Sequence, residues 1–320
     1  MPLTLLRKPL VTQPLVNERS ETAPLVTAFL RQFSMEITRP SDAGLGQLKA
    51  VLPARSPVYV PAIPNSPLSE LIAAATRLRA QGFEPVPHIA ARHIESRAAL
   101  EDLLSRLSRW ANVRRALIIG GDVATAAGPF NSALELIDSG LLQRHGIAEI
   151  GISGYPEGHP KLSLETLDRA LAAKIEAAEQ TGLAVTIVTQ FCFDAPAIMN
   201  WIKRLRALGL EHPVRIGMAG PASFAALMRY ARLCGVRASA HGLACQPGLV
   251  KHLLGVSTPD RIIRPLAEAC AEGALGRVSA HFFSFGGAAA TARWAAAAAA
   301  GRIVLDRAGG FGVAPPCEQP

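Results

Sequence analysis

Several features are scarce in this chain, and each scarcity excludes a class of protein. Only five of the 320 residues are cysteine, and none of them forms a Cys-x-x-Cys pair. This odd, scattered set argues against a disulfide framework or a zinc site and favours a reducing, cytoplasmic location. No apolar run is long enough to span a bilayer, and Arg7 and Lys8 interrupt the apolar start before it reaches the length of a signal-peptide core.

Aromatic residues make up only 5% of the chain, and its basic residues are scattered although the net charge is +8. Nucleic-acid-binding proteins usually carry basic clusters, so we expect no nucleic-acid partner. The positive charge fits attraction of small anionic ligands. A hydrophobic fraction of 49% and a charged fraction of 18% are typical of a folded protein. The sequence leaves open whether the protein is a monomer or a homo-oligomer.

From about residue 31 onward, short apolar runs alternate with longer segments of helical pattern. The eight strand-like runs are Gln32–Ile37, Pro57–Pro61, Glu84–Ile89, Ala116–Ile119, Ala148–Ile152, Val185–Thr189, Val214–Gly217 and Val278–Ser284. Several are continuously apolar, as parallel strands covered on both faces should be. Strand–helix alternation predicts a parallel sheet, and eight units of this kind favour a closed (β/α)8 barrel.

The main alternative is an open, doubly wound α/β sheet. Such a sheet usually carries G-x-G-x-x-G after its first strand, and no such string follows Ile37. We therefore predict one α/β domain, a (β/α)8 TIM barrel over residues 31–306, with an N-terminal arm at 1–30 and a flexible C-terminal tail at 307–320. The segment 238–276 contains one clear helical pattern, near Asp260–Glu272, and we interpret it as an insertion before the eighth strand.

Polar residues stand at the carboxyl ends of the predicted strands, where barrel enzymes gather their functional side chains. They are Glu36, His88, Asp122, the loop from Tyr155 to His159, and Gln190. All of them would face the same mouth of the barrel. We therefore expect them to form one site.

Each of these residues also has a structural interpretation. A carboxylate in an apolar strand is costly unless it is paired, so Glu36 is either half of an ion pair or a catalytic acid. Asp122 follows two glycines and could cap a turn. His88 could be a hydrogen-bonded core histidine, Gln190 could satisfy a backbone group, and Tyr155 could be an ordinary turn residue.

Several short strings resemble motifs of the methylenetetrahydrofolate reductase family. Phe33–Ile37 resembles the family's first-strand motif, Ile119–Asp122 its R-G-D or G-G-D turn, and Gly154–Pro160 its Y-P-E-x-H-P loop. Thr189–Asp194 resembles the T-Q-F-x-F-D motif, which is the most specific of the set, and Gly217–Phe224 resembles a degraded G-I-x-P loop. Because these strings occur in the family's order, the chain is identified as a divergent member.

The resemblance implies a flavin-dependent reduction of 5,10-methylenetetrahydrofolate to 5-methyltetrahydrofolate. FAD would lie in the barrel mouth, and NADH or NADPH would be the co-substrate. By similarity, the catalytic residues are Glu36 and Asp122. Glu36 would protonate the bridging nitrogen of the folate as a general acid, and Asp122 would lie near the flavin and the pterin and act on the developing positive charge.

The resemblance also implies binding residues. Gln190 and Phe224 would bind the folate, although Phe224 could equally be an apolar residue at a helix start. The positions that match FAD contacts in the family are His88, Asp122, Tyr155, His159 and Lys174. Lys174 could equally be a solvated lysine on a helix surface.

Three loops depart from the family's pattern. They are Val60–Asn65 after strand two, Ala90–His93 after strand three, and Ser284–Gly287 after strand eight, where the family has Thr-, Gly- or Asn-bearing strings. The glycines of the last loop could bind phosphate through backbone N–H groups or simply permit a tight turn. Two alternatives to the reductase therefore stay open. One is a family member that binds folate without flavin or works with a methyl-transfer partner, and the other is a non-enzymatic binding protein.

Overall fold

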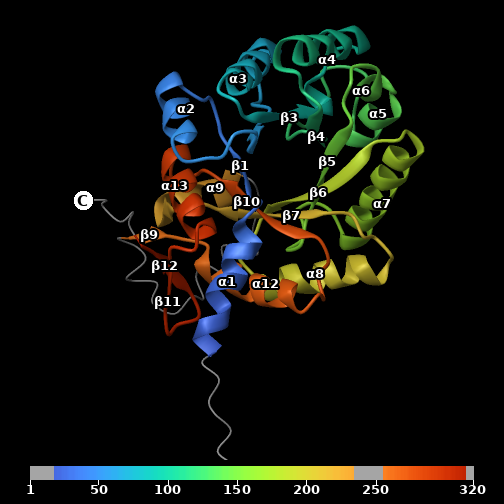
Figure 1. Cartoon of the computed structure of the whole chain (residues 1–320). Helices are drawn as coiled ribbons and strands as arrows, with labels where there is room; N and C mark the ends of the chain where they lie inside the picture. Colours follow the sequence, from blue (N-terminus) through green and yellow to red (C-terminus); the bar gives the residue numbers. More distant parts are fainter. Residues whose placement is uncertain (1–17, 234–254, 315–320) are drawn as a thin grey trace, which may run out of the picture.

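The computed structural model describes residues 18–233 and 255–314, and their strands close into a barrel (Figure 1). The barrel order is β1-β10-β7-β6-β5-β4-β3-β2, and the pairing around it is parallel. The strands are β1 (Ser34–Glu36), β2 (Pro57–Val60), β3 (Glu84–Ala90), β4 (Arg115–Ile119), β5 (Glu149–Gly154), β6 (Ala184–Phe191), β7 (Val214–Ala219) and β10 (Val278–Phe283). The predicted (β/α)8 barrel is confirmed, and each predicted strand corresponds to one strand of the barrel.

Helices surround the barrel, as Figure 1 shows. They are α2 (Asp42–Lys49), α3 (Leu68–Ala80), α4 (Arg97–Ala111), α5 (Ala133–Asp138), α6 (Leu141–Arg144), α7 (Leu164–Gln180), α8 (Ala195–Ala207), α9 (Phe224–Leu233), α12 (Asp260–Ala271) and α13 (Ala288–Ala299). Several begin at a side-chain cap: Ser96, Ser163 and Asp194 each accept a hydrogen bond from a backbone N–H in the first turn. These caps satisfy amide groups that a helix leaves without partners.

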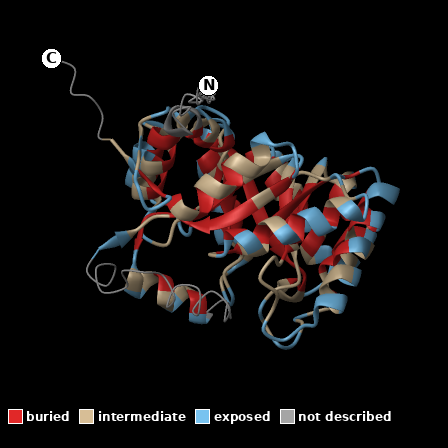
Figure 2. Cartoon of the chain, turned by 90° about the horizontal axis from the view of Figure 1, so that it is seen from below, coloured by how far each residue is buried: buried red, intermediate tan, exposed pale blue. Residues whose placement is uncertain are grey.

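The core has two layers because successive side chains of a strand point to opposite faces. Outward-facing residues such as Ile118 and Ile150 are fully buried between the sheet and the helices. Inward-facing Tyr59, Val86 and Leu117 form a separate cluster inside the barrel. Figure 2 shows buried residues along the strands and exposed ones on the outer faces of the helices.

The amino-terminal end of the barrel is closed by polar contacts. Arg115 pairs with Glu149 at 2.8 Å, and the Thr186 hydroxyl donates to the same carboxylate at 2.9 Å. Arg215 donates to the Ser34 hydroxyl at 3.1 Å. This end is therefore a packed floor, which leaves the carboxyl ends of the strands as the open mouth.

The segment predicted as an N-terminal arm contains a helix where it is described. Helix α1 (Glu18–Leu30) packs against α12 and α13, and its Val26 and Leu30 are fully buried. Residues 1–17 lie outside the described residues. The end of the arm therefore belongs to the packed body of the protein.

The C-terminal segment also differs from the predicted flexible tail. Strands β11 (Ile303–Leu305) and β12 (Phe311–Val313) form an antiparallel hairpin, and Phe311 stacks on Trp294 with ring centroids 5.7 Å apart. Burial of this aromatic ring holds the hairpin on α13, so residues 307–314 are structured. Residues 315–320 lie outside the described residues.

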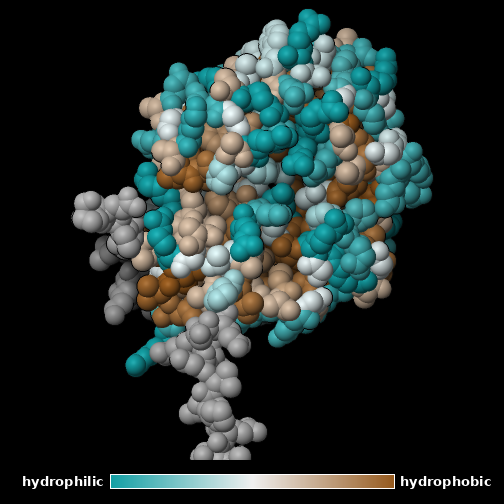
Figure 3. Space-filling view, viewed as in Figure 1, coloured by the Kyte–Doolittle hydropathy of each residue, from teal (hydrophilic) through white to brown (hydrophobic). Residues whose placement is uncertain are grey.

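The predicted insertion before the eighth strand falls partly on residues 234–254, which lie outside the described residues. Its described part contains β9 (Val256–Ser257), which pairs antiparallel with β8 (Ala222–Ser223), followed by α12 at the predicted place. Across the described ranges, no helix combines the length and apolarity that a membrane crossing needs. Figure 3 shows hydrophilic and hydrophobic residues interspersed over one face of the molecule.

Candidate active site

Glu36 and His88 meet inside the mouth of the barrel. Glu36 ends β1 and His88 lies near the end of β3, and their Oε2 and Nε2 atoms are 3.3 Å apart. Both side chains are nearly buried, at 14% and 8% exposure. The approach lacks hydrogen-bond geometry, since Nε2 of His88 makes no hydrogen bond within the described part of the chain. The structure thus joins two residues that the sequence placed 52 positions apart.

Burial drives the two groups toward their neutral forms. It raises the pKa of Glu36 to about 8 and lowers the pKa of His88 to about 3. At neutral pH the carboxyl therefore keeps its proton and the imidazole is uncharged, because a low-dielectric site disfavours either charge. The pair is thus not an ion pair at that pH. A protonated carboxyl in an enclosed mouth can act as a general acid.

Two inward-facing aromatic residues support this pair from below. The Tyr59 ring packs edge-on against His88 and His281, with centroid separations of 6.0 and 4.6 Å. His281 is fully buried, and its Nδ1 lies 2.9 Å from the Ser34 hydroxyl. Sequence reasoning missed Tyr59 and His281. Their signal was the alternation of inward positions along β2 and β10.

A second group gathers at the ends of β4 and β5. Burial is the larger influence on the pKa of both Tyr155 and His159, and the Asp122 charge acts on both in the raising direction. Those rings lie edge to face with centroids 5.3 Å apart. Burial raises the pKa of Tyr155 and lowers the pKa of His159. The preceding Gly121 has φ +94°, a conformation that glycine adopts easily and that turns the chain sharply before Asp122.

Gln190 sits at an irregularity in the barrel. The β6–β7 pairing shifts register between Val188 and Phe191, and the Gln190 side-chain oxygen accepts a hydrogen bond from the Phe191 N–H at 3.0 Å. The Thr189 hydroxyl accepts from the Gly217 N–H at 2.8 Å. The side-chain oxygen of Gln190 therefore satisfies a backbone group, as its structural interpretation supposes.

Aromatic rings line the β6–β10 side of the mouth. Phe285 stacks on Tyr230 with centroids 4.0 Å apart, and Phe191 lies 5.0 Å from Phe285 and 5.6 Å from Phe283. Phe224 packs on the neighbouring apolar cluster that also includes Phe285. The sequence indicated Phe224 but not Phe283 or Phe285, because rings from three separate segments meet only in the fold.

Lys174 lies on helix α7. It occupies the third turn of α7, ten residues after the helix begins at Leu164, which corresponds to roughly 15 Å along the axis. Partial burial lowers the pKa of Lys174 to about 8. Among the described residues, the groups that act on the pKa of Tyr155 and His159 do not include this lysine, so its part in cofactor binding stays a prediction.

Gly286, which follows the eighth barrel strand, allows two backbone segments to pack closely. A Cβ added at Gly286 would lie 2.0 Å from the backbone oxygen of Pro221 and 2.7 Å from Cα of Ala222. The Ser284 hydroxyl also donates to the Glu36 backbone oxygen at 2.6 Å. These contacts favour the tight-turn interpretation of the loop over phosphate binding.

The donor set at the ends of β4 and β5 fits a flavin dinucleotide. Tyr155 and His159 offer hydrogen-bonding groups for hydroxyls or phosphates, and a Cβ at Gly120 would meet no atom within 4 Å, so a ligand can approach its backbone. Inward-facing Leu117 and Ile119 give an apolar surface beside them. Polar groups around an apolar wall are what a large aromatic cofactor requires.

The fold is a (β/α)8 barrel that holds the Glu36 carboxyl inside its mouth. Sequence comparison identifies the family to which this barrel belongs. The family model for methylenetetrahydrofolate reductase matches residues 65–245, more than half of the chain. The protein therefore belongs to the methylenetetrahydrofolate reductase family of oxidoreductases, as its motifs predicted. Glu36 precedes the matched range, and it is the fold that brings it beside the matched residue His88.

Curated relatives match over part of their length. The chain is 27% identical over 159 residues to 5,10-methylenetetrahydrofolate reductase of Pectobacterium carotovorum subsp. carotovorum, covering 49% of this chain and 50% of that protein. The corresponding enzyme of Salmonella typhimurium is 26% identical over 161 residues, with 49% and 50% covered. Methylenetetrahydrofolate reductase 2 of Saccharomyces cerevisiae is 34% identical over 90 residues, with 26% and 14% covered. The aligned region thus spans about half the length of the two bacterial relatives.

Among solved structures, dihydropteroate synthase from Thermus thermophilus aligns with a TM-score of 0.44 at 14% identity, covering 79% of this chain and 88% of that one. This likeness is too distant to bear on function.

Proposed function

We propose that this protein reduces 5,10-methylenetetrahydrofolate to 5-methyltetrahydrofolate, using FAD and a nicotinamide dinucleotide. The observation that carries the proposal is the enclosed Glu36 carboxyl, which keeps its proton at neutral pH because burial raises its pKa to about 8. Opening the five-membered ring of the substrate requires a proton on its bridging nitrogen, and a positioned neutral carboxyl supplies one. Family membership supports the same reaction.

Each remaining residue has a part in this proposal. Asp122, Tyr155 and His159 hold the cofactor at the ends of β4 and β5, and Asp122 places a negative charge where positive charge develops on the folate. Gln190 and the aromatic wall with Phe224 bind the folate. His88 stays uncharged and so leaves the proton on Glu36. FAD, when bound, supplies the hydride that the folate receives.

The departures in the β2 and β3 loops favour one alternative, a folate-binding family member without flavin. Losing a neutral hydrogen bond costs about 0.5–1.5 kcal/mol, so two or three losses weaken FAD binding roughly 10- to 1000-fold. We expect purified protein to bind FAD saturably but to lose part of it on gel filtration. Fluorescence titration with FAD and the accompanying rise in melting temperature measure this. Absence of binding at high micromolar FAD would replace the reductase by the flavin-free alternative.

The Glu36→Gln variant tests the acid directly. Flavin reduction by the dinucleotide should stay nearly intact, while folate reduction should slow by at least about 100-fold, as expected for loss of a general acid. In the parent protein, folate reduction should decline as pH rises through about 8, because Glu36 then loses its proton. Stopped-flow measurement of the two half-reactions separates these effects. The solvent-exposed Glu165→Gln is the matched control, and an equal fall in both half-reactions would make Glu36 structural.

A further inference from the structure

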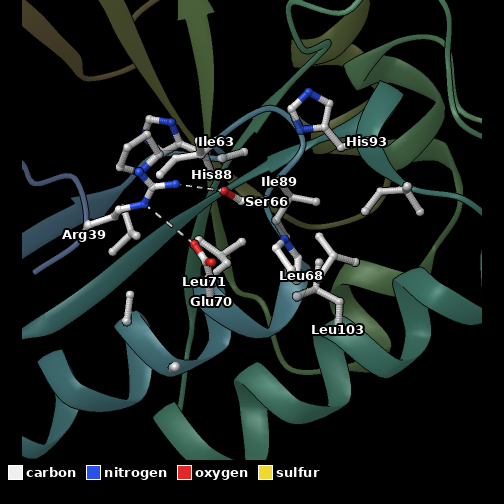
Figure 4. Close-up of a pocket in the computed structure, with 18 of the residues that line it drawn as sticks. Arg39, Ile63, Ser66, Leu68, Glu70, Leu71, His88, Ile89, His93 and Leu103 are labelled. Carbon is white, nitrogen blue, oxygen red and sulfur yellow. Dashed lines mark hydrogen bonds and ion pairs between the residues drawn. The ribbon is translucent and has the colours of Figure 1, made fainter.

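A cavity of about 310 Å³ lies on the helix side of β2 and β3 (Figure 4). Outward-facing Val60 and Ile89 form its inner wall, Leu71 and Ala74 of α3 form its outer wall, and Leu103 of α4 closes one end. All of these residues belong to the core layer between the sheet and the helices. The cavity therefore lies mainly between the sheet and the helices, and His88 is a residue that it shares with the mouth of the barrel.

Two of the loops in which the sequence departs from the family pattern line this cavity. Pro61, Ala62 and Ile63 come from the loop after β2, and Ala90 and His93 come from the end of β3 and the turn that follows. The departures include an exchange of polar or glycine-bearing strings for small and apolar residues. Loops that are separate in the sequence therefore line one largely apolar cavity.

The charged residues that line the cavity are Arg39, Arg77 and Glu70. Arg77 has a second acidic neighbour outside the lining, because it lies 3.8 Å from Asp42. Arg39 lies 3.8 Å from Glu70 and donates to the Ser66 hydroxyl at 3.3 Å, and Figure 4 shows these contacts across the entrance. Both members of the ion pair are more than half exposed, so the pair is weak and a carboxylate can compete for the guanidinium.

The backbone also holds Arg39 at this entrance in an unusual conformation. Its φ is +48°, in the left-handed region that residues other than glycine seldom adopt. Such conformations persist where the surrounding structure enforces them, and they cluster at functional sites.

We propose that this cavity binds a compact apolar molecule that carries one carboxylate, such as an aromatic acid. The apolar body lies between α3 and the outer faces of β2 and β3, and the carboxylate is held at the entrance by Arg39. A volume of about 310 Å³ is at the small end of ligand sites and suits one or two fused rings. His88 also lines the cavity and contacts Glu36, so an occupant lies next to the acid of the mouth. The proposal does not depend on the reductase activity.

The test uses 2-naphthoate as the probe and isothermal titration calorimetry on the whole chain. We expect saturable binding in the low-millimolar range or tighter, as is usual for a ligand of this size. The neutral 2-naphthamide should bind about tenfold more weakly, since a charge-assisted hydrogen bond is lost. Equal binding of the two compounds would overturn the role of Arg39. Absence of 2-naphthoate binding at roughly 10 mM would overturn the site.

Paired variants locate the probe. Ala73→Leu fills the cavity from an exposed position of α3, and Ala74→Leu fills it from a buried one. Each should weaken 2-naphthoate binding at least about tenfold, whereas Ala172→Leu on the exposed face of α7 should not change it. The exposed position of Ala73 keeps the test valid if Ala74→Leu fails to fold. Unchanged binding in a folded Ala73→Leu variant would place the probe elsewhere.

The entrance and the cofactor need separate controls. Arg39→Gln should weaken 2-naphthoate binding about tenfold, while Arg31→Gln, an exposed arginine outside the cavity, should leave it unchanged. Protein saturated with FAD should bind 2-naphthoate as the free protein does. Displacement of the probe by FAD would show that the cavity is part of the mouth and would overturn the proposal, whereas a protein that binds 2-naphthoate but not FAD would contradict the proposed function alone.

Discussion

The two sides of the barrel mouth differ in chemistry. On the β4–β5 side, Asp122, Tyr155 and His159 form a polar group carried by loops that resemble the family's motifs. On the β2–β3 side, the loops contribute apolar residues such as Pro61 and Ile63 to a cavity against α3 and α4. Both sides stand on the same outer core, which holds the strands whatever the loops contain. The barrel can therefore keep one set of contacts while the other changes, because loop residues are not what fixes the strand positions.

Glu36 and His88 lie between these two sides. Both are inside the mouth, yet His88 also borders the cavity. Their neutral state depends on how well the β2–β3 side excludes water. Substitutions can therefore disturb the Glu36–His88 pair, the loops and the polar β4–β5 side separately.

The largest expected effect is on stability as a function of pH. The folded-state pKa of Glu36 is about 8, above its ordinary 4.5, so the native state keeps a proton that the unfolded chain releases between these values. Stability should therefore fall as pH rises through this window. Relative to Glu36→Gln, the parent should lose up to about 4 kcal/mol between about pH 5 and 9, an order-of-magnitude figure. Urea denaturation at several pH values measures it.

His88 should change the stability of the protein with pH in the opposite direction to Glu36. Its pKa is lowered from 6.5 to about 3, so its contribution is present above 6.5 and is lost as pH falls toward 3. Replacing Glu36 should remove the loss of stability between about pH 5 and 9 and leave the loss below about pH 4 in place. A parallel shift of both limbs of the stability curve, or the same change in the exposed control Glu165→Gln, would contradict burial of Glu36 as the cause.

The sequence predicted the barrel well for a physical reason. Strands covered on both faces, such as Ala116–Ile119 in β4, are continuous apolar runs, and that pattern is visible without knowledge of the fold. The sequence pattern did not predict helix α1, because Pro24 and the neighbouring prolines obscure a helix that is stabilised by packing on α12 and α13. The pattern also did not predict the β11–β12 hairpin, in which Phe311 is buried against the alanine-rich helix α13.

The site was predictable only where residues stand at strand ends. Glu36 and Asp122 follow from that rule, because the carboxyl ends of parallel strands share one edge. The contact between Glu36 and His88 did not follow, since it depends on the closure of β1 onto β2 and β3 around the barrel. The cavity was hidden for the same reason, as its walls come from β2, β3, α3 and α4 together.

The next prediction concerns the loop after β10. Gly286→Ala would bring a Cβ to within 2.0 Å of the Pro221 backbone oxygen, and backbone atoms cannot move away cheaply. We expect a loss of about 1–3 kcal/mol in the free energy of unfolding, the usual cost of overpacking. The control is Gly46→Ala in α2, where a Cβ meets nothing and helix propensity should add about 0.5–1 kcal/mol. A Gly286→Ala protein as stable as the parent would restore the phosphate-binding interpretation of this loop.

A smaller effect is expected on the polar side of the mouth. Asp122→Asn should lower folate turnover about tenfold and raise the flavin potential, because a negative charge near the cofactor disfavours its reduced anion. The pKa of His159 should fall, because the Asp122 charge raises it in the parent. Proton NMR titration of His159 measures this without any cofactor. Asp102→Asn, an exposed replacement on α4, is the control. If folate turnover, the flavin potential and the pKa of His159 all stayed unchanged, Asp122 would be only a turn residue.

The smallest expected effect separates Lys174 from the cofactor. This lysine matches a flavin-contact position by resemblance, yet it lies roughly 15 Å along α7 from the helix start beside the mouth. Lys174→Met keeps most of its apolar stem packed and removes the charge. FAD affinity should therefore stay within about twofold of the parent, whereas His159→Ala, which acts at the mouth, should weaken it about tenfold, as loss of one hydrogen bond allows. Fluorescence titration compares the two variants. A loss in Lys174→Met as large as that in His159→Ala would mean that the cofactor extends down α7, and the polar side of the mouth would then reach further than the loops after β4 and β5.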